Sequence, residues 1–288
     1  MNSPLTPDQN FKRVWLITGA SRGIGALIAK AALADGDAVV AAGRNIDAIV
    51  AELGEGPAVL PVRLDVTSEQ EAATAVRTAL ERFGRIDVLV NNAGFGLLGA
   101  VEESSDAETR RLYETNVFGL LNVTRAVLPS MRARGVGHVI NLSSIGGYRS
   151  SAGFGVYCST KFAVEGLSEA LHSELAPLGI NVTVVEPGYF RTDFLDASSL
   201  AVSPNIIEDY AETAGAVRSR AASLNHQQPG DPRKLAKAMV ELVRAKTPPL
   251  RLPLGSDTLQ AIAQKNEAVA TELETWRALS ASTDFSAE

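Results

Sequence analysis

A tyrosine and a lysine stand four residues apart in the run Tyr157-Cys158-Ser159-Thr160-Lys161. On a helix, side chains four residues apart share a face, so the phenol and the ammonium group would lie together. A neighbouring cation favours the phenolate and lowers the pKa of a tyrosine from about 10. Such a tyrosine can transfer protons near neutral pH. Many surface helices also carry a Tyr–Lys pair, so the spacing alone is weak evidence of catalysis.

A glycine-rich turn, Gly-x-x-x-Gly-x-Gly from Gly19 to Gly25, is the second candidate. Glycines allow a tight turn and let a pyrophosphate approach the backbone, and the following helix N-terminus supplies N–H groups and positive potential. The first gap is one residue longer than in the usual dinucleotide fingerprint. Placed after the first strand of a β-α-β unit, the turn predicts a dinucleotide site.

Two serines, Ser143 and Ser144, follow an apolar stretch that predicts a strand. A hydroxyl at the carboxyl end of such a strand can polarise a carbonyl oxygen in the crevice of a parallel sheet. The alternative is that these serines cap a turn. Cys158 would lie off the Tyr157–Lys161 face, and we interpret it as a small buried residue rather than a nucleophile.

Strands and helices must alternate to position these residues. Apolar stretches predict strands at residues 14–18, 38–42, 58–64, 86–90, 138–142 and 181–185, with helical patterns between them. Strands that are apolar on both faces and alternate with helices indicate a parallel sheet covered on both sides. The sequence therefore predicts an α/β fold, a doubly wound parallel sheet of the Rossmann type, with its crevice at the carboxyl ends of the strands.

The helices have signals of their own. Ser68, with Glu71 three residues later, predicts a reciprocal capping box at the start of a helix that runs to about Phe83. Two longer helical patterns cover residues 106–131 and 154–178.

The predicted organisation is one domain over residues 11–288, preceded by a flexible arm at residues 1–10. Residues 194–228 follow the crevice, are weakly patterned and are rich in Ala and Ser. This composition predicts a mobile substrate lid, and a disordered insertion is the alternative. A helix at 232–244, a strand at 250–252 and a helix at 256–279 complete the chain.

Composition excludes several classes of function. The 288 residues carry 27 Lys and Arg against 33 Asp and Glu, a net charge of −6, which disfavours binding to nucleic acid or to anionic membrane surfaces. One cysteine forms no intrachain disulfide, and the three histidines have no zinc-site spacing, so no metal is expected. There is neither a stretch of signal-peptide type nor an apolar run long enough to cross a membrane, so a cytoplasmic location is expected.

From Val14 to Thr192 the sequence resembles the classical short-chain dehydrogenases/reductases. The resemblance rests on motifs that occur in the family's order: the turn from Thr18 to Gly25, Asp65, Asn91-Asn92-Ala93-Gly94, Asn116, Ser144, Tyr157 with Lys161, and Pro187-Gly188 followed by Thr192. Each motif is weak alone, but the ordered set is specific.

The resemblance implies four catalytic residues. Tyr157 is the expected acid/base, and Lys161 is expected to lower its pKa and to hold the nicotinamide ribose. Ser144 is expected to orient the carbonyl group. Asn116 matches the asparagine that helps to hold a water molecule in the proton relay.

The resemblance also implies a site for a nicotinamide dinucleotide. The expected contacts are Gly19, Ser21, Arg22, Gly23, Ile24, Gly25, Arg44, Asp65, Val66, Asn91, Ala93, Gly94, Tyr157, Lys161, Pro187, Gly188 and Thr192. NADP(H) is expected rather than NAD(H), because Gly43 stands where an NAD enzyme usually places an acid, and Arg44 follows at once. Arg22 can approach the same 2′-phosphate. The alternative is that both arginines are solvated.

The predicted function is NADP(H)-dependent hydride transfer to or from a carbonyl or secondary alcohol substrate of fairly apolar character. The expected pocket walls are Phe95, Leu97, Ile145, Tyr148, Phe154, Tyr189 and Phe194. One alternative is a non-catalytic NADP(H)-sensing protein, although such proteins usually lose the tyrosine or the lysine. Another is an epimerase or dehydratase of the extended branch, which usually has a longer C-terminal domain. A homodimer or homotetramer is expected from the resemblance.

Overall fold

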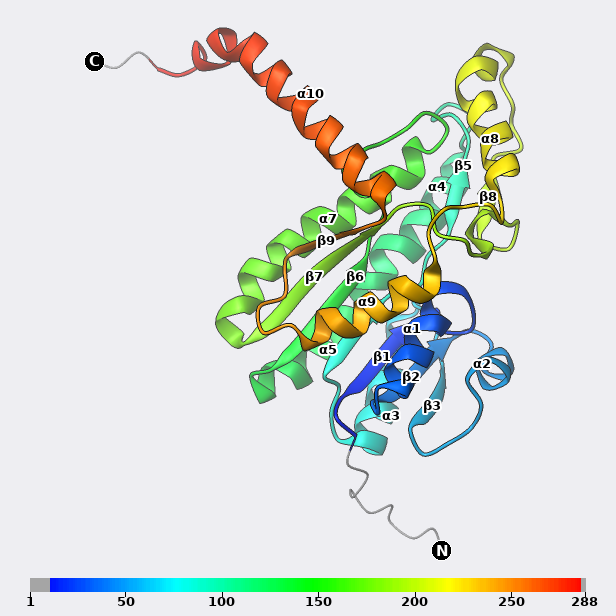
Figure 1. Ribbon diagram of the computed structural model, residues 1–288, viewed down its shortest axis with the longest axis vertical. Coiled ribbons are helices and arrows are strands. Elements are labelled where there is room, and N and C mark those ends of the chain that lie inside the picture. Colours follow the sequence, from blue (N-terminus) through cyan, green and yellow to red (C-terminus); the bar gives the residue numbers. More distant parts are fainter. Residues whose placement is uncertain (1–10, 286–288) are drawn as a thin grey trace, which may run out of the picture.

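Seven strands form one parallel sheet in the computed structural model, which describes residues 11–285 (Figure 1). In sheet order they are β3 (Val59–Arg63), β2 (Ala38–Gly43), β1 (Val14–Thr18), β4 (Val88–Asn91), β6 (Gly137–Leu142), β7 (Ile180–Pro187) and β9 (Arg251–Leu254). The chain winds outward from β1 to β3 and then, from β4, in the opposite direction. The predicted doubly wound sheet is confirmed, and its order reverses between β1 and β4, where such folds form a ligand crevice.

Helices cover both faces of this sheet (Figure 1). One face packs against α1 (Gly23–Ala34), α2 (Ile46–Leu53) and α9 (Pro232–Arg244), and the other against α3 (Glu69–Phe83), α5 (Gly119–Arg134) and α7 (Gly155–Leu175). Strand β1 is apolar from Val14 to Ile17 because both of its faces are buried. Leu16 packs into the α3–α5–α7 layer, whereas Trp15 and Ile17 pack into the α1–α2–α9 layer. Successive side chains of a strand point to opposite faces, and here both faces are core.

The helix expected at residues 106–131 is not regular. Helix α4 (Asp106–Tyr113) leads into a π-helical turn, η1 (Glu114–Phe118), before α5 begins. A π-turn fits one extra residue into the helix, and a turn of five residues is too short to be recognised from the apolar periodicity. Asn116, an expected catalytic residue, lies in this turn.

The capping box expected at α3 is only half present. The Ser68 hydroxyl accepts a hydrogen bond from Glu71 N at 3.1 Å, as predicted. The Glu71 carboxylate, however, accepts from Asp65 N at 2.8 Å. The N–H of Ser68 already donates to the Asp65 carbonyl oxygen at 3.0 Å, so it is not available to Glu71.

The predicted lid region contains more structure than its composition indicates. Strand β8 (Leu200–Val202) pairs in parallel with β5 (Gly96–Leu98) to form a second, two-stranded sheet. The remaining elements are α6 (Ile145–Tyr148), η2 (Ala176–Leu178), η3 (Asp193–Leu195), η4 (Glu208–Tyr210), η5 (Ala211–Gly215), α8 (Ala216–Leu224) and α10 (Ser256–Ala281). Helix α10 extends away from the body of the protein (Figure 1).

The flexible arm expected at residues 1–10 lies outside the described residues. Among residues 11–285, no helix has both the length and the apolar character needed to cross a bilayer.

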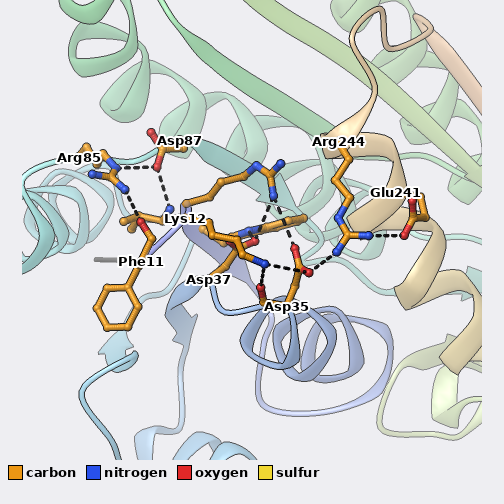
Figure 2. A network of polar contacts seen from close by, with 11 residues as sticks. Phe11, Lys12, Asp35, Asp37, Arg85, Asp87, Glu241 and Arg244 are labelled. Carbon is orange, nitrogen blue, oxygen red and sulfur yellow. Dashed lines mark hydrogen bonds and ion pairs between the residues drawn. The ribbon is translucent and has the colours of Figure 1, made fainter. Parts of the chain in front are cut away.

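A polar network joins the amino ends of the central strands, at the edge of the sheet away from the crevice (Figure 2). Asp87 accepts hydrogen bonds from Val14 N at 2.8 Å, from Arg85 Nε at 2.9 Å and from Arg134 Nη2 at 2.5 Å. One carboxylate thus holds the start of β1 against the end of α5.

Replacing Asp87 with Ala should lower the free energy of unfolding by about 2–3 kcal/mol, because a backbone N–H and a partly buried guanidinium lose a charged acceptor. Urea denaturation measures this change. The control is Glu81→Ala, whose ion pair with Arg77 is exposed and 3.9 Å long, and which should cost less than about 0.5 kcal/mol. Equal effects of the two substitutions would contradict the role given to Asp87.

Candidate active site

A cavity of about 1600 Å³ opens at the carboxyl ends of the strands. The glycine turn after β1 and the loops after β2, β3, β4, β6 and β7 line it, together with part of the 194–228 segment. The cavity therefore lies at the predicted edge of the sheet.

The glycine turn is shaped for a ligand rather than for side chains. Gly19 and Gly23 adopt positive φ angles of 66° and 57°, which favour glycine. A Cβ atom on Gly25 would lie 2.4 Å from the Gly19 carbonyl oxygen, so the turn leaves no room for one. No side chain caps the N-terminus of α1, and its first residues, Gly23 and Ile24, line the cavity. Unpaired N–H donors at a helix N-terminus fit a pyrophosphate.

Asn92 braces this turn, a role that the sequence reasoning did not assign. Its amide Nδ2 donates to the carbonyl oxygens of Thr18 at 2.9 Å and Gly19 at 3.2 Å. In return, the Thr18 hydroxyl oxygen accepts from the N–H groups of Asn92 and Ala93, both at 3.0 Å. The loops after β1 and β4 are thereby fixed relative to each other. The family motif contains Asn92, and that motif is the signal that could have identified it.

Two expected cofactor contacts do not line the cavity. Asn91 is 5% exposed, and its Nδ2 donates to Thr124 Oγ1 and Asn141 Oδ1, each at 2.9 Å. Asn91 is the last residue of β4 and points into the core beside β6, where its register partner is Asn141. Gly25 is buried behind Gly19.

The end of the cavity near β2 and β3 carries charged groups. Arg44 is exposed and follows β2 directly, and it lines the cavity with Asp65 and Val66. Burial raises the pKa of Asp65, but hydrogen bonds from Thr67 outweigh this effect and hold the pKa below its usual value. Arg22 donates to Ser198 O at 2.7 Å and to Ser199 Oγ at 2.9 Å, so its guanidinium contacts the 194–228 segment.

Tyr157, Lys161 and Ser144 come together at the other end of the cavity. Helix α7 supplies the tyrosine and the lysine, which are 7% and 8% exposed, and Lys161 Nζ lies 5.9 Å from the centre of the phenol ring. The Ser144 hydroxyl caps α6 by accepting from Gly146 N at 3.0 Å, and it lies near enough to the phenol of Tyr157 to lower the pKa of that group. Both sequence interpretations of Ser144, a cap and a carbonyl-orienting group, are thus compatible.

The expected depression of the tyrosine pKa is wrong for this structure. Burial raises the pKa of Tyr157 above its usual value, and the nearby Ser144 hydroxyl opposes this only in part. The ring lies between Phe154 and Phe194, with centroid distances of 6.1 and 5.8 Å. The Lys161 ammonium instead donates to the carbonyl oxygen of Leu142 at 2.7 Å. Burial also lowers the pKa of Lys161 to about 8.

Asn116 lies behind the lysine rather than in the cavity wall. Its Oδ1 accepts from Phe95 N at 3.1 Å, and its Nδ2 donates to Phe95 O at 2.9 Å and to Thr160 Oγ1 at 3.2 Å. A Cβ atom on Gly94 would lie 3.0 Å from Asn116 Oδ1 and 3.9 Å from Lys161 Nζ. Asn116 therefore holds the loop after β4 close to the lysine.

Most of the expected contacts do line the cavity. They are Gly19, Ser21, Arg22, Gly23, Ile24, Arg44, Asp65, Val66, Ala93, Gly94, Pro187, Gly188 and Thr192, with Phe95, Ile145, Phe154, Tyr189 and Phe194 among the expected walls. Leu97 is not a wall, because β5 pairs with β8 and Leu97 is 2% exposed, buried in the apolar cluster that also holds Phe154 and Tyr157. Tyr148 is not a wall either, because its hydroxyl donates to Asn266 Oδ1 of α10 at 2.5 Å. Arg111 and Arg220, which sequence reasoning missed, line the cavity from distant parts of the chain.

One group of possible metal ligands was not expected. Asp193, Asp196 and His226 each place a ligand atom within 4.8 Å of the others. His226 Nε2 lies 3.2 Å from Asp196 Oδ1, and Asp193 and His226 are exposed. The contact with Asp196 brings His226 close to the two aspartates. The spacing of these residues in the sequence did not indicate this.

Glu103 anchors the 194–228 segment. Its carboxylate is 1% exposed and accepts from Arg218 Nη1 at 2.6 Å, from Ile207 N at 3.0 Å and from Ala100 N at 2.7 Å. The hydrogen bonds from Arg218 and these two backbone groups hold the pKa of Glu103 at about 2. The carboxylate therefore joins the loop after β5 to both halves of the segment.

Comparisons with known proteins give a consistent result. The family model described as short chain dehydrogenase matches residues 13–202. Oxidoreductase BOA17 of Botryotinia fuckeliana is 39% identical over 271 residues, which cover 93% of this chain and 98% of that protein. A 3-ketodihydrosphingosine reductase of Bacteroides thetaiotaomicron is 38% identical over 244 residues, 84% of this chain and 88% of that protein. A crystal structure of a short-chain dehydrogenase from Streptomyces avermitilis matches with a TM-score of 0.87 and 43% identity, covering 95% of this chain and 99% of that chain.

Replacing Glu103 with Gln should increase proteolytic cleavage between residues 204 and 227 at pH 7, because the anchor loses its charge. The folded-state pKa is depressed, so this stabilisation is complete above the usual value of 4.5 and is lost as the pH falls toward 2. The difference in urea stability between wild type and variant should shrink over the same range. Glu102→Gln, whose exposed carboxylate only accepts from the Tyr210 hydroxyl, is the control. Identical cleavage of all three proteins would disprove the anchoring role.

Proposed function

The chain belongs to the short-chain dehydrogenase/reductase family, and we propose that it is an NADP(H)-dependent oxidoreductase acting on a carbonyl group or a secondary alcohol. One observation carries the proposal: Tyr157, Lys161 and Ser144 meet in the same cavity as a glycine turn with free helix N–H donors. A protein that only senses NADP(H) would not need the tyrosine and the lysine.

The chain's own residues supply the proton chemistry. A bound nicotinamide dinucleotide supplies the hydride in reduction and accepts it in oxidation. In reduction, the Tyr157 phenol donates its proton to the carbonyl oxygen, and the Ser144 hydroxyl donates a hydrogen bond to the same atom. The Lys161 ammonium, held by the Leu142 carbonyl, stabilises the phenolate that remains.

The raised pKa of Tyr157 favours reduction at neutral pH. A buried phenol stays protonated there and can act as a general acid. Reduction should therefore hold its rate through neutrality and decline at alkaline pH, whereas oxidation, which needs the phenolate, should become faster as the pH rises.

Preference for NADP(H) is supported by the residues that follow β2. A carboxylate in this position would bind both ribose hydroxyls and repel a 2′-phosphate, and Gly43 provides none. Arg44 is exposed and borders the cavity, where its charge also helps to lower the pKa of Asp65, and a guanidinium in this position can bind a phosphate.

The substrate that best fits the cavity is fairly apolar. Phe95, Phe154 and Phe194 line it and pack in one cluster with Tyr157. Arg111, Arg149 and Arg220 are among the charged residues that also line the cavity. The name of the Bacteroides relative, a 3-ketodihydrosphingosine reductase, describes a substrate with a carbonyl group, and this supports the same class here. The 194–228 segment would act as the lid. A cytoplasmic location and a homodimer or homotetramer stay predictions.

Replacing Tyr157 with Phe should lower kcat for carbonyl reduction by ~10²–10⁴-fold, the usual loss when an acid/base is removed, while NADPH still binds. Steady-state kinetics and fluorescence titration measure the two quantities. Tyr148→Phe is the matched control, because that hydroxyl contacts α10 outside the cavity, and it should leave kcat unchanged. Near-normal turnover by the Tyr157 variant would refute the proposed mechanism.

Replacing Arg44 with Ala should weaken NADPH binding roughly ten- to a hundredfold, the value of a charge-assisted hydrogen bond, with little change for NADH. Calorimetric titration gives both dissociation constants. Arg63→Ala is the control, since Arg63 is exposed beside Gly43 in the sheet and does not border the cavity. Equal affinity of the wild type for NADPH and NADH would be incompatible with the proposed preference.

A further inference from the structure

Two glutamates bury their carboxyl groups together behind the proposed catalytic residues. Glu165 on α7 is 6% exposed, and Glu186 on β7 is fully buried. Glu165 follows Lys161 by four residues, as Lys161 follows Tyr157, so the three side chains share one face of α7. One nitrogen atom, Arg251 Nε, lies within 3.5 Å of both carboxyl groups, so the two groups lie close together.

One guanidinium serves both carboxyl groups. Arg251 Nε lies 3.4 Å from Glu165 Oε2 and 3.5 Å from Glu186 Oε1. The same guanidinium also pairs with Glu169, which is exposed. Within residues 11–285, none of the four buried carboxyl oxygens receives a hydrogen bond of good geometry from an N–H group. A single cation therefore faces two buried carboxyl groups and a third at the surface.

A retained proton resolves this arrangement. Two ionised carboxylates in contact repel each other, and burial removes the water that would screen them. If one carboxyl group keeps its proton, the excess negative charge falls by one and an O–H donor becomes available between the two groups. Consistent with this, burial and the neighbouring Glu165 raise the pKa of Glu186 to about 7, and burial raises the pKa of Glu165, although Arg251 opposes both shifts.

Besides Arg251 and the two other glutamates, Glu165 has one further charged neighbour, Lys161. Lys161 and Glu169 face it from α7, Glu186 from β7 and Arg251 from β9. The end of β6 contributes only the Ser143 hydroxyl. Helix α6 contributes Gly147, where a Cβ atom would lie 2.3 Å from Ser143 Oγ and 3.0 Å from Glu165 Oε1. The negative charge of Glu165 raises the pKa of Lys161 and so counteracts part of the effect of burial.

We propose that Glu165 and Glu186 share one proton at neutral pH and act as positioning residues that keep Lys161 in its charged form. The catalytic part of this inference rests on the proposed function. The shared proton does not, because it follows from the packing of the two carboxyl groups. The pair acts through the lysine and does not touch the substrate.

Infrared spectroscopy of the purified full-length protein tests the shared proton without any turnover. The spectrum near pH 7 should contain the C=O stretch of a protonated carboxyl group, which should diminish in both E165Q and E186Q. E169Q is the matched control, because Glu169 lies on the same helix and contacts the same arginine but is exposed. A protonated-carboxyl signal that neither E165Q nor E186Q reduces would overturn the shared proton.

The pH dependence of kcat/KM for carbonyl reduction tests the positioning role. On the alkaline side both wild-type carboxyl groups are ionised, so E165Q removes one negative charge there. This loss favours the deprotonated form of Lys161 and Tyr157 and should move the alkaline limb to lower pH by roughly 0.5–1 unit. Thermal unfolding would verify that the variant is folded. E169Q should not move the limb.

Each outcome of the kinetic test is decisive. A folded E165Q whose profile superimposes on that of the wild type, or an equal shift in E169Q, overturns the positioning role. Absence of turnover in the wild type with NADPH and a range of apolar ketones and aldehydes contradicts the proposed function and the positioning role together. The infrared result then still decides whether the proton is shared.

Discussion

Burial of the central strands on both faces is the constraint on which this structure depends. In β1, Leu16 packs on one layer of helices while Trp15 and Ile17 pack on the other, so the strand offers no face to a ligand. Polar chemistry is therefore confined to the ends of the strands, where side chains leave the core. The carboxyl ends of parallel strands coincide, and residues from distant parts of the chain consequently meet there. The amino ends instead carry the network around Asp87 that joins β1 to α5.

The same burial determines the electrostatics of the site. Removing Tyr157 and Lys161 from water favours the neutral form of each, so the pKa of the tyrosine rises, that of the lysine falls, and the two values move apart. Polar contacts then modify the protonation of the two groups. Ser144 lies near the phenol and lowers its pKa, and the Leu142 carbonyl accepts a hydrogen bond from the ammonium. Behind them, Glu165 and Glu186 add negative charge that Arg251 only partly neutralises.

The sequence was informative wherever a function depends on residues close together in the chain. The spacing of Tyr157 and Lys161, and the glycine turn before α1, follow from local geometry and were correctly placed in one crevice. Features that depend on tertiary contacts could not be predicted from the sequence. The five-residue π-helical turn that holds Asn116 is too short to be recognised from the apolar pattern, and the direction in which Asn91 points depends on how β4 pairs with β6. The protonation of Tyr157 depends on the rings of Phe154 and Phe194, and one of these lies in the segment with the weakest pattern.

Because β5 pairs with β8, a change of substrate range on this fold has to treat the two strands and their segments together. The chain between β7 and α9 is not a detachable flap, because its strand completes a sheet begun just after Gly94, and Glu103 joins the two again farther along. Transplanting this segment alone from a relative would leave one strand unpaired and one carboxylate buried without its arginine. Residues 95–104 and 194–218 therefore form one exchangeable module, and a chimaera that respects it must carry both pieces together.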